Sequence, residues 1–221
     1  MEDPIQRHPT RAEQLDILAT VLADTVPEGG RLLDLGVGTG YVAHLVLSRR
    51  PDLDLVGIDL KQDSLDAAKT NLPNGPNGAR RDFVQGDLNR LPEIVLPHAS
   101  YDAVVCALTF HDLADTAKQA VIEWVAQCLV PGGRFVLYDR LRLTEAAAFP
   151  LQQSLWRRIA QVHGAAMRDA DDFDAYVADL GQTNRPAALE DYLTWFRDAK
   201  LSPAILHLHG NIALLSASRA S

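Results

Sequence analysis

The hydrophobic positions alternate between helical and strand spacing through the first 140 residues. Leu15, Leu18, Leu22 and Val26 repeat as one face of a helix, which Pro27-Glu28-Gly29-Gly30 ends. Further helices are predicted over 40–50, 62–71 and around 117–128. Short apolar runs predict buried strands at 31–36, 54–59, 83–87, 101–108 and 134–139.

Strands that are separated by helices require crossover connections, so this pattern predicts an α/β fold with a mainly parallel sheet and helices on both faces. The end of the chain differs, because the strands predicted at 204–209 and 212–218 are joined only by Gly210-Asn211. So short a connection forces antiparallel pairing. We therefore expect a doubly wound sheet of seven strands that finishes in an antiparallel hairpin.

A long helical region, roughly 143–200, separates the fifth strand from that hairpin. Apolar residues predict three helices in it, around 151–159, 173–180 and 189–196. One crossover helix is enough, and the last of the three serves that purpose. Helices beyond this need, at the carboxyl ends of strands, often cover a ligand. The sequence therefore predicts that 143–184 is a helical insertion forming a lid over a ligand.

Composition narrows the class of protein. A length of 221 residues indicates a single domain over 1–221, and 21 basic against 29 acidic residues give a net charge of −8, which disfavours a nucleic-acid partner. Cys106 and Cys128 stand in apolar surroundings and indicate a reducing compartment. The polar N-terminal residues 1–9 show no secretion signal, and no run approaches the ~18 apolar residues of a membrane span. We expect a cytoplasmic protein with no membrane contact.

The segment 33–40, Leu-Asp-Leu-Gly-Val-Gly-Thr-Gly, lies between a predicted strand and a predicted helix. Its glycines allow a ligand to approach the backbone, and the helix start presents free N–H groups. Asp59 ends the next strand, nineteen residues after Gly40. A carboxylate at that place can bind both hydroxyls of a ribose. The two features together indicate a nucleoside site.

Neither of the common nucleotide loops matches this segment. A dinucleotide fingerprint needs a third glycine where Tyr41 stands, and the Gly-Lys-Ser/Thr of a Walker loop is absent. Instead, the acidic Asp34 precedes the first glycine by two positions, and Gly86-Asp87-Leu88 follows the third strand. An aspartate there can accept a hydrogen bond from an adenine amino group.

Five segments in this order and spacing resemble the class I S-adenosylmethionine-dependent methyltransferases: LLDLGVGTG (32–40), VGID (56–59), FVQGD (83–87), YDAVVCALTFHDL (101–113) and LVPGGRFVLYD (129–139). The resemblance covers 31–139 and implies that this part is a cofactor-binding core. It also implies a Rossmann-like sheet of seven strands, S-adenosylmethionine as cofactor and methyl transfer as the reaction.

The resemblance further implies which residues hold the methionine part of the cofactor. Gly36, Gly38 and Gly40 would line it, and Asp34 would help to hold its amino group. The backbone after the fourth strand, at Ala107 and Leu108, would reach the amino group or the sulfonium side.

The nucleoside part has its own implied residues. Asp59, followed by Leu60, would bind the ribose diol in a charge-assisted contact, and Asp87 with the amide of Leu88 would bind adenine. The alternative for both aspartates is an ordinary turn residue at the end of a strand.

His111 is the candidate general base, since it follows the fourth strand at the edge where the methyl group would lie. Relatives often have His-His-Leu here, whereas this chain has His111-Asp112-Leu113. In the alternative interpretation, His111 and Asp112 cap the helix predicted near Ala114. Asp139 and Arg140, at the end of the fifth strand, are weaker candidates for contact with the methyl acceptor.

The expected reaction is methyl transfer to a small molecule, without a metal ion. A second interpretation is an enzyme similar to the carboxy-S-adenosylmethionine synthases, in which Arg185 or Arg168 would pair with a carboxylate on the modified sulfonium. A third is a cofactor-binding module without catalysis.

Overall fold

A computed structural model describes residues 10–163, 170–181 and 184–221 of the chain. The predictions on the N-terminal residues 1–9, on Arg168 and on part of the insertion therefore lie outside the described residues. Within the described ranges, no helix is long and apolar enough to cross a membrane.

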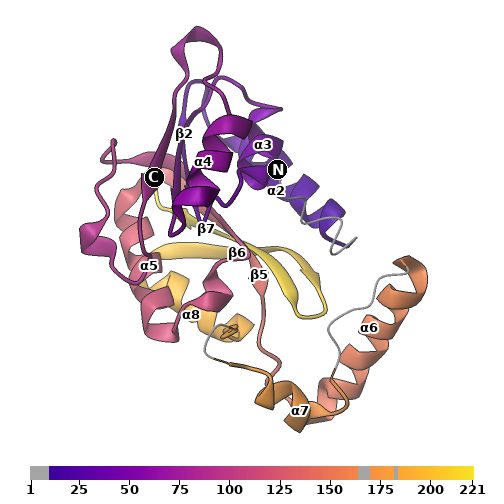
Figure 1. The fold of residues 1–221 in the computed structure, drawn as a ribbon. Helices are drawn as coiled ribbons and strands as arrows, with labels where there is room; N and C mark the ends of the chain where they lie inside the picture. The colour runs from indigo at the N-terminus through magenta and orange to yellow at the C-terminus, as the bar shows by residue number, and fades with distance from the viewer. Residues whose placement is uncertain (1–9, 164–169, 182–183) are drawn as a thin grey trace.

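The described residues form one seven-stranded sheet with the order β3-β2-β1-β4-β5-β7-β6. The first five strands are parallel, and β7 runs antiparallel to both β5 and β6 (Figure 1). This confirms the doubly wound sheet with a terminal hairpin. The strands are β1 (Arg31–Leu35), β2 (Asp54–Asp59), β3 (Arg81–Gln85), β4 (Tyr101–Ala107), β5 (Leu129–Arg140), β6 (Leu201–His209) and β7 (Ile212–Arg219).

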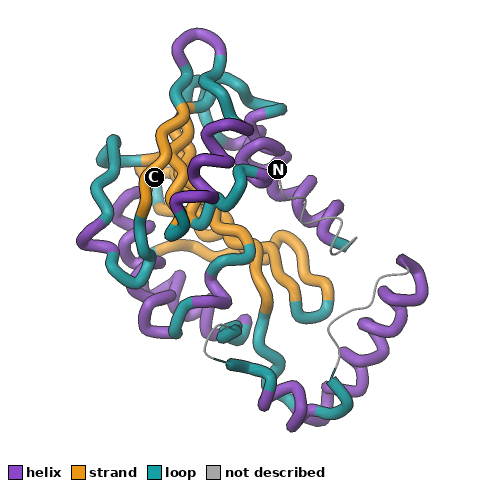
Figure 2. The backbone as a smooth tube through the Cα atoms, in the orientation of Figure 1, coloured by secondary structure: helices purple, strands orange, loops and turns teal. Residues whose placement is uncertain are grey.

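Helices cover both faces of this sheet (Figure 2). One face packs against the helices over 11–25, 41–47 and 62–71, and the other against those over 115–128 and 189–198, so each face has its own apolar cluster. The α-helices are α2 (Arg11–Thr25), α3 (Tyr41–Leu47), α4 (Gln62–Asn71), α5 (Asp115–Cys128), α6 (Phe149–His163), α7 (Phe173–Ala178) and α8 (Leu189–Asp198).

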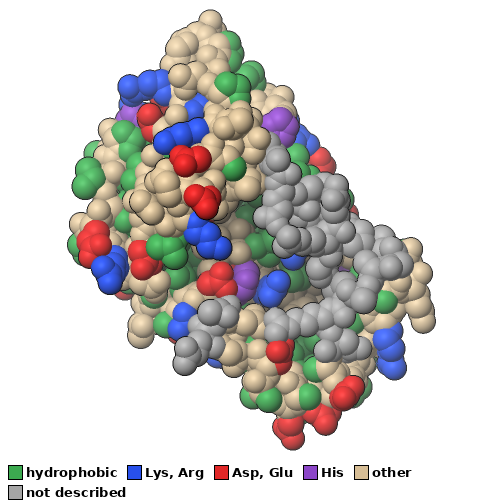
Figure 3. Space-filling view, viewed as in Figure 1, with side chains coloured by type: hydrophobic (Ala, Val, Ile, Leu, Met, Phe, Trp, Pro, Cys, Tyr) green, Lys and Arg blue, Asp and Glu red, His purple; other side chains and the backbone are tan. Residues whose placement is uncertain are grey.

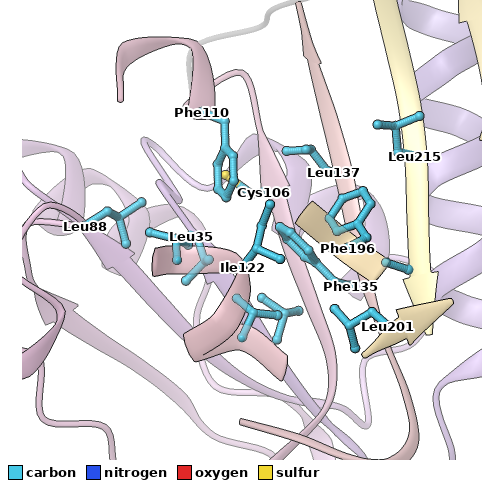
Figure 4. Close-up of a cluster of buried hydrophobic side chains, with 14 of the residues drawn as sticks. Leu35, Leu88, Cys106, Phe110, Ile122, Phe135, Leu137, Phe196, Leu201 and Leu215 are labelled. Carbon is cyan, nitrogen blue, oxygen red and sulfur yellow. The ribbon is translucent and has the colours of Figure 1, made fainter. Parts of the chain in front are cut away.

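The cluster beneath α5 and α8 includes several packed aromatic side chains. Phe110, in the short 3-10 helix η3 (Phe110–Asp112) after β4, is fully buried and lies 5.8 Å from the ring of Phe135 (Figure 4). Phe135 in turn meets Phe196 of α8 edge to face at 5.9 Å. Burial of a phenylalanine contributes roughly 1.5–3 kcal/mol. The turn that follows β4 is therefore anchored firmly in the core.

Several predicted strand boundaries are wrong, including the start of β6, which lies at Leu201 and not at 204. β3 ends at Gln85, so Gly86 and Asp87 lie beyond the strand instead of closing it. β5 begins at Leu129, five residues earlier than predicted, because Leu129 pairs with Tyr101 before the register shifts. Pro131-Gly132-Gly133 lies within that irregular stretch of β5 rather than in a separate loop.

Most of the predicted insertion stands apart from the sheet. In Figure 1, α6 and α7 project beyond the end of β5. Phe149, Trp156 and Tyr176 bury one another in a small cluster of their own, with the Phe149 and Trp156 rings 5.9 Å apart. These aromatic side chains therefore form the core of the insertion, and α8 alone packs back against the main cluster, as predicted for the crossover helix.

Candidate functional site

The strand order changes direction at β1, which pairs with β2 on one side and β4 on the other. Chains that leave neighbouring strands in opposite directions open a crevice at their carboxyl ends, where ligands of α/β sheets bind. The glycine loop, residues 36–40, leaves β1 at this point and leads into α3.

Gly36 lies under the turn that follows β4. Its N–H donates to the Ile58 carbonyl at 2.8 Å, and its φ is +75°. A Cβ added there would come within 2.2 Å of Thr109 Oγ1. The close approach of Thr109 and the positive φ both require glycine, and this contact joins the glycine loop to the turn that carries His111.

Gly38 faces open space. Its φ is +53°, yet an added Cβ would meet nothing within 4 Å. Its N–H donates to Asp59 Oδ2 at 2.9 Å. Gly40, with φ +89°, is the N-cap residue before α3 and would clash with Leu72 if it carried a Cβ. The loop is thus packed at both ends and free in the middle, where a ligand can reach its backbone.

Asp34 is a buried carboxylate in the sheet below this loop, with only 1% of its surface exposed. Its Oδ2 has no hydrogen-bond partner among the described residues. Burial, reinforced by the negative charge of Asp59, raises the pKa of Asp34 to about 7. Buried polar atoms without a partner are rare and costly. The carboxylate fits a ligand that brings a cation to the loop.

Asp59 holds the glycine loop in place. Its Oδ2 accepts from the Gly38 N–H and its Oδ1 from the Lys61 N–H, both at 2.9 Å. Each carboxylate oxygen can accept a second hydrogen bond, so a ribose contact remains open to Asp59. Leu60 beside it is 60% exposed and presents an apolar surface to that ligand region.

Asp87 takes part in a turn. Its Oδ1 accepts from the backbone and the side-chain amide of Asn89, at 2.9 and 2.8 Å. Leu88 is buried in the apolar cluster under α5. The turn interpretation of Asp87 holds in the structure, and its contact with adenine stays a prediction.

Leu108 has an unusual backbone conformation at the end of β4. Its φ is +56°, a region that non-glycine residues rarely adopt. Its N–H donates to the Tyr138 carbonyl at 2.8 Å, and the Ala107 carbonyl accepts from Thr109 Oγ1 at 3.3 Å. The Leu108 amide is therefore occupied, so a ligand contact from the Leu108 backbone would use its carbonyl oxygen. Strained residues of this kind cluster at functional sites.

His111 does not cap the following helix, so that alternative is wrong. α5 begins at Asp115 behind Ala114, without any side-chain cap. Instead, His111 is buried, with Nδ1 2.6 Å from Asp139 Oδ1, and its backbone N–H donates to Asp139 Oδ2 at 2.7 Å. This pair was not predicted from the sequence. A parallel pairing of β4 with β5 could have indicated it, because that pairing brings the carboxyl ends of the two strands side by side.

The segment before α8 is tied to the His111 turn. Arg185 donates its backbone N–H to the His111 carbonyl at 2.6 Å, and its guanidinium donates to the Asp112 carbonyl. The Arg185 carbonyl accepts from Lys118 Nζ, which also donates to Asp115 at 2.7 Å. Burial lowers the pKa of Lys118. The segment that directly follows the insertion therefore packs against the turn that carries the candidate base.

Two cavities lie beside this junction. One of about 220 Å³ is lined by Asp115, Arg142 and Arg185. The other, of about 300 Å³, begins at Arg142 and runs along the apolar side chains of Leu151 and Leu155 on α6. Figure 3 shows acidic, basic and histidine side chains gathered between the main body and the projecting helical region. Among the described residues, no group of three or more His, Cys, Asp or Glu side chains is placed to hold a metal ion.

Comparison with known proteins points to one kind of domain. A family model for the methyltransferase domain matches residues 32–133. A demethylmenaquinone methyltransferase of Deinococcus radiodurans is 38% identical over 109 residues, which are 49% of this chain and 42% of that protein. A carboxy-S-adenosyl-L-methionine synthase of Campylobacter lari is 25% identical over 133 residues, 60% of this chain and 54% of that protein. The chain thus spans about half the length of these curated relatives.

The fold is also similar to that of a solved methyltransferase structure. The crystal structure of magnesium protoporphyrin IX methyltransferase from Synechocystis PCC 6803, with bound S-adenosylhomocysteine, superposes with a TM-score of 0.66. The superposition covers 100% of this chain and 89% of that one, at 17% sequence identity. At this identity the match establishes the fold.

Proposed function

The chain belongs to the class I S-adenosylmethionine-dependent methyltransferase family, and from this premise we propose that it methylates a small-molecule acceptor. The observation that carries the proposal is the buried Asp34 carboxylate, which lacks a partner on Oδ2 and lies beneath an open glycine loop. S-adenosylmethionine bears an ammonium and a sulfonium group, so a site with Asp34 and Asp59 suits its positive charge. The charge of Asp34, which a dinucleotide site does not need, disfavours the pyrophosphate that a dinucleotide would bring to the same loop.

The residues at the crevice fit the parts of this cofactor in turn. Asp34 would accept from the ammonium group, with Gly38 leaving room for the methionine backbone. Asp59 would hold the ribose, and the exposed face of Leu60 would cover the apolar side of the nucleoside. Asp87 and the Leu88 amide remain our proposed adenine contacts.

When bound, S-adenosylmethionine supplies a methyl group on a cationic sulfur, which retains the electron pair of the broken bond. The protein aligns the acceptor with that methyl group, excludes water and, where the acceptor atom carries a proton, removes it. We assign the last task to His111, on the turn that Thr109 packs against Gly36.

Residues 143–184 are proposed to cover the acceptor. Support comes from the cavity that extends from Arg142 along Leu151 and Leu155, and from the hydrogen bonds that join Arg185 to the His111 turn. The lining indicates an acceptor with an apolar body. The match to demethylmenaquinone methyltransferases agrees with a small acceptor of that character.

Synthesis of a carboxylated cofactor is the weaker alternative. It requires an arginine that pairs with a carboxylate on the sulfonium. The Arg185 guanidinium already donates one hydrogen bond to the Asp112 carbonyl, and Arg168 lies outside the described residues. Mass spectrometry of the reaction products separates the two activities, because methyl transfer releases S-adenosylhomocysteine.

Calorimetric titration with S-adenosylhomocysteine tests the cofactor assignment. Asp59→Ala should weaken binding at least tenfold, because it removes charge-assisted hydrogen bonds worth ~1.5–3 kcal/mol each. The structure adds that this variant also loses two hydrogen bonds to the loop, so its free energy of unfolding should fall by roughly 1–2 kcal/mol. Asp63→Ala, on the exposed start of α4, is the matched control and should bind normally. Saturable NAD binding, or unchanged affinity in Asp59→Ala, would contradict the assignment.

The state of Asp34 predicts a pH dependence for cofactor binding. Without ligand the carboxyl group has a pKa of about 7, so below that pH it is largely protonated. An ammonium group binds the ionised form, so affinity should rise as pH increases from about 6 to 8, with release of a proton. Titrations in buffers of different ionisation enthalpy measure that release.

Asp34→Asn is the control for this linkage. It should bind weakly at every pH and release no proton. Because folding raises the pKa of Asp34 from 3.8 to about 7, the ligand-free fold loses stability as pH rises between these values, and the full loss is present at pH 8. The variant should therefore melt higher than the wild type at pH 8. An equal proton release in both proteins would assign the linkage to another group.

The proposed lid predicts that variants of its cavity lining and variants of its core will have different effects. Leu151→Ser combined with Leu155→Ser changes exposed cavity-lining side chains and should raise the acceptor KM without changing cofactor affinity. Trp156→Ala removes a buried ring of the insertion core and should cost ~3–5 kcal/mol in the stability of that part. Steady-state kinetics and proteolysis of both variants separate these effects. An unchanged KM in the double variant would remove the support for the lid.

A further inference from the structure

Asp139 is a buried carboxylate at the end of β5 whose two oxygens both receive hydrogen bonds from backbone N–H groups. We propose that Asp139 is the positioning residue of His111: it fixes the imidazole with the proton on Nδ1 and leaves Nε2 as the atom that accepts the proton of the methyl acceptor. This inference rests on the proposed function.

Three donors converge on the carboxylate. Oδ2 accepts from the His111 N–H at 2.7 Å, whereas Oδ1 lies 2.7 Å from the Arg140 N–H and 2.6 Å from His111 Nδ1. Because the carboxylate oxygens accept, Nδ1 must be the nitrogen that carries the hydrogen. The same side chain therefore sets the ring orientation and its tautomer.

Only a carboxylate of this length meets all three donors. An asparagine would place an NH₂ group either against the His111 N–H, or against the Arg140 N–H and Nδ1 together. Both arrangements bring two donors face to face, and the second reverses the tautomer. The requirement for two accepting oxygens distinguishes positioning of the ring from simple filling of space.

The other nitrogen of the ring has no comparable partner. Nε2 lies 3.7 Å from Asp112 Oδ1, too far for a hydrogen bond, and the Asp112 side chain is 56% exposed. The turn is held by Phe110 in the core and by the Arg185 N–H on the His111 carbonyl. The imidazole is thus held at Nδ1, whereas no hydrogen bond from the described residues occupies Nε2.

The proton balance follows from this arrangement. As the acceptor atom forms its bond to the methyl carbon, its own proton moves to Nε2. The ring then carries a positive charge, which the Nδ1–H shares with the Asp139 carboxylate in a charge-assisted hydrogen bond. Deprotonation of Nε2 by solvent restores the starting form.

Nitrogen-15 NMR of the imidazole tests the tautomer in the protein without any substrate. We expect His111 to be neutral with the proton on Nδ1 in the wild type, and to shift toward the Nε2–H form in Asp139→Asn. Asp112→Asn is the matched control, because it changes the carboxylate on the exposed edge and should leave the Nδ1–H tautomer in place. A wild type with the proton on Nε2, or with both nitrogens protonated at neutral pH, would overturn the proposal.

Kinetics supply the second readout. Asp139→Asn should lower kcat by ~10²–10⁴-fold and leave the affinity for S-adenosylhomocysteine within about twofold. A fall in thermal stability with full kcat in the folded fraction would show that Asp139 is merely structural. If no acceptor turns over and S-adenosylhomocysteine does not bind, the proposed function fails, while the NMR result still decides whether Asp139 fixes the ring.

Discussion

Replacing His111 with asparagine is expected to lower kcat by ~10²–10⁴-fold while the affinity for S-adenosylhomocysteine changes by less than about twofold. The variant keeps a polar side chain on the turn but removes the atom that accepts the acceptor's proton. Cofactor binding should be spared because Asp34, Gly38 and Asp59 are untouched. Single-turnover kinetics with a labelled methyl group measure the chemical step, and calorimetry measures the affinity.

A matched histidine outside the site provides the control. His44 lies on the exposed side of α3, where its carbonyl accepts from Ser48, and His44→Asn should retain full kcat. A stable His111→Asn protein with undiminished kcat would leave alignment and exclusion of water as the sources of rate.

The sheet could be predicted from local patterns, because each strand is marked by its own apolar run and by the length of the connection that follows it. The apolar run 31–36 ends in glycines, and the two residues Gly210-Asn211 leave no length for a crossover, so pairing direction follows from chain geometry. β5 was predicted too short, since Pro131 and two glycines usually mark a loop. Pairing of Leu129 with Tyr101 overrides that local preference.

The site was predictable only in part, because its decisive contacts join residues far apart in the chain. His111 and Asp139 were each recognised at the end of a strand, but their 2.6 Å contact depends on the alignment of β4 with β5. Arg185 reaches the same turn from 74 positions further along the chain, and the segment between them gives no spacing rule for that contact. Sequence patterns thus locate the edge of the sheet where we place the chemistry, and tertiary packing pairs the side chains there.

The glycine loop permits a sharper test through two identical substitutions, Gly36→Ala and Gly38→Ala. At Gly36 the new methyl group would lie 2.2 Å from Thr109 Oγ1, with β-branched Thr109 unable to move far. Overpacking costs ~1–3 kcal/mol and a positive φ adds ~1–2 kcal/mol, so the free energy of unfolding should fall by roughly 2–5 kcal/mol. Thermal unfolding measures this loss, and Thr109→Ala in the same chain should recover part of it.

Gly38→Ala should behave in the opposite way, because its methyl group would enter open space. Only the cost of its positive φ remains, ~1–2 kcal/mol, so the protein should stay folded. The space that the methyl group fills is the space we assign to the methionine part of the cofactor, and calorimetry should therefore show at least a tenfold loss of affinity for S-adenosylhomocysteine. Both substitutions replace one hydrogen with the same methyl group in the same loop, so general loosening of the loop would give them the same outcome. Normal affinity in a folded Gly38→Ala protein would show that the ligand does not bind at the glycine loop. The expected contrast would instead show that Gly36 is needed for stability, through the Thr109 contact, and that Gly38 is needed for binding, through its open face.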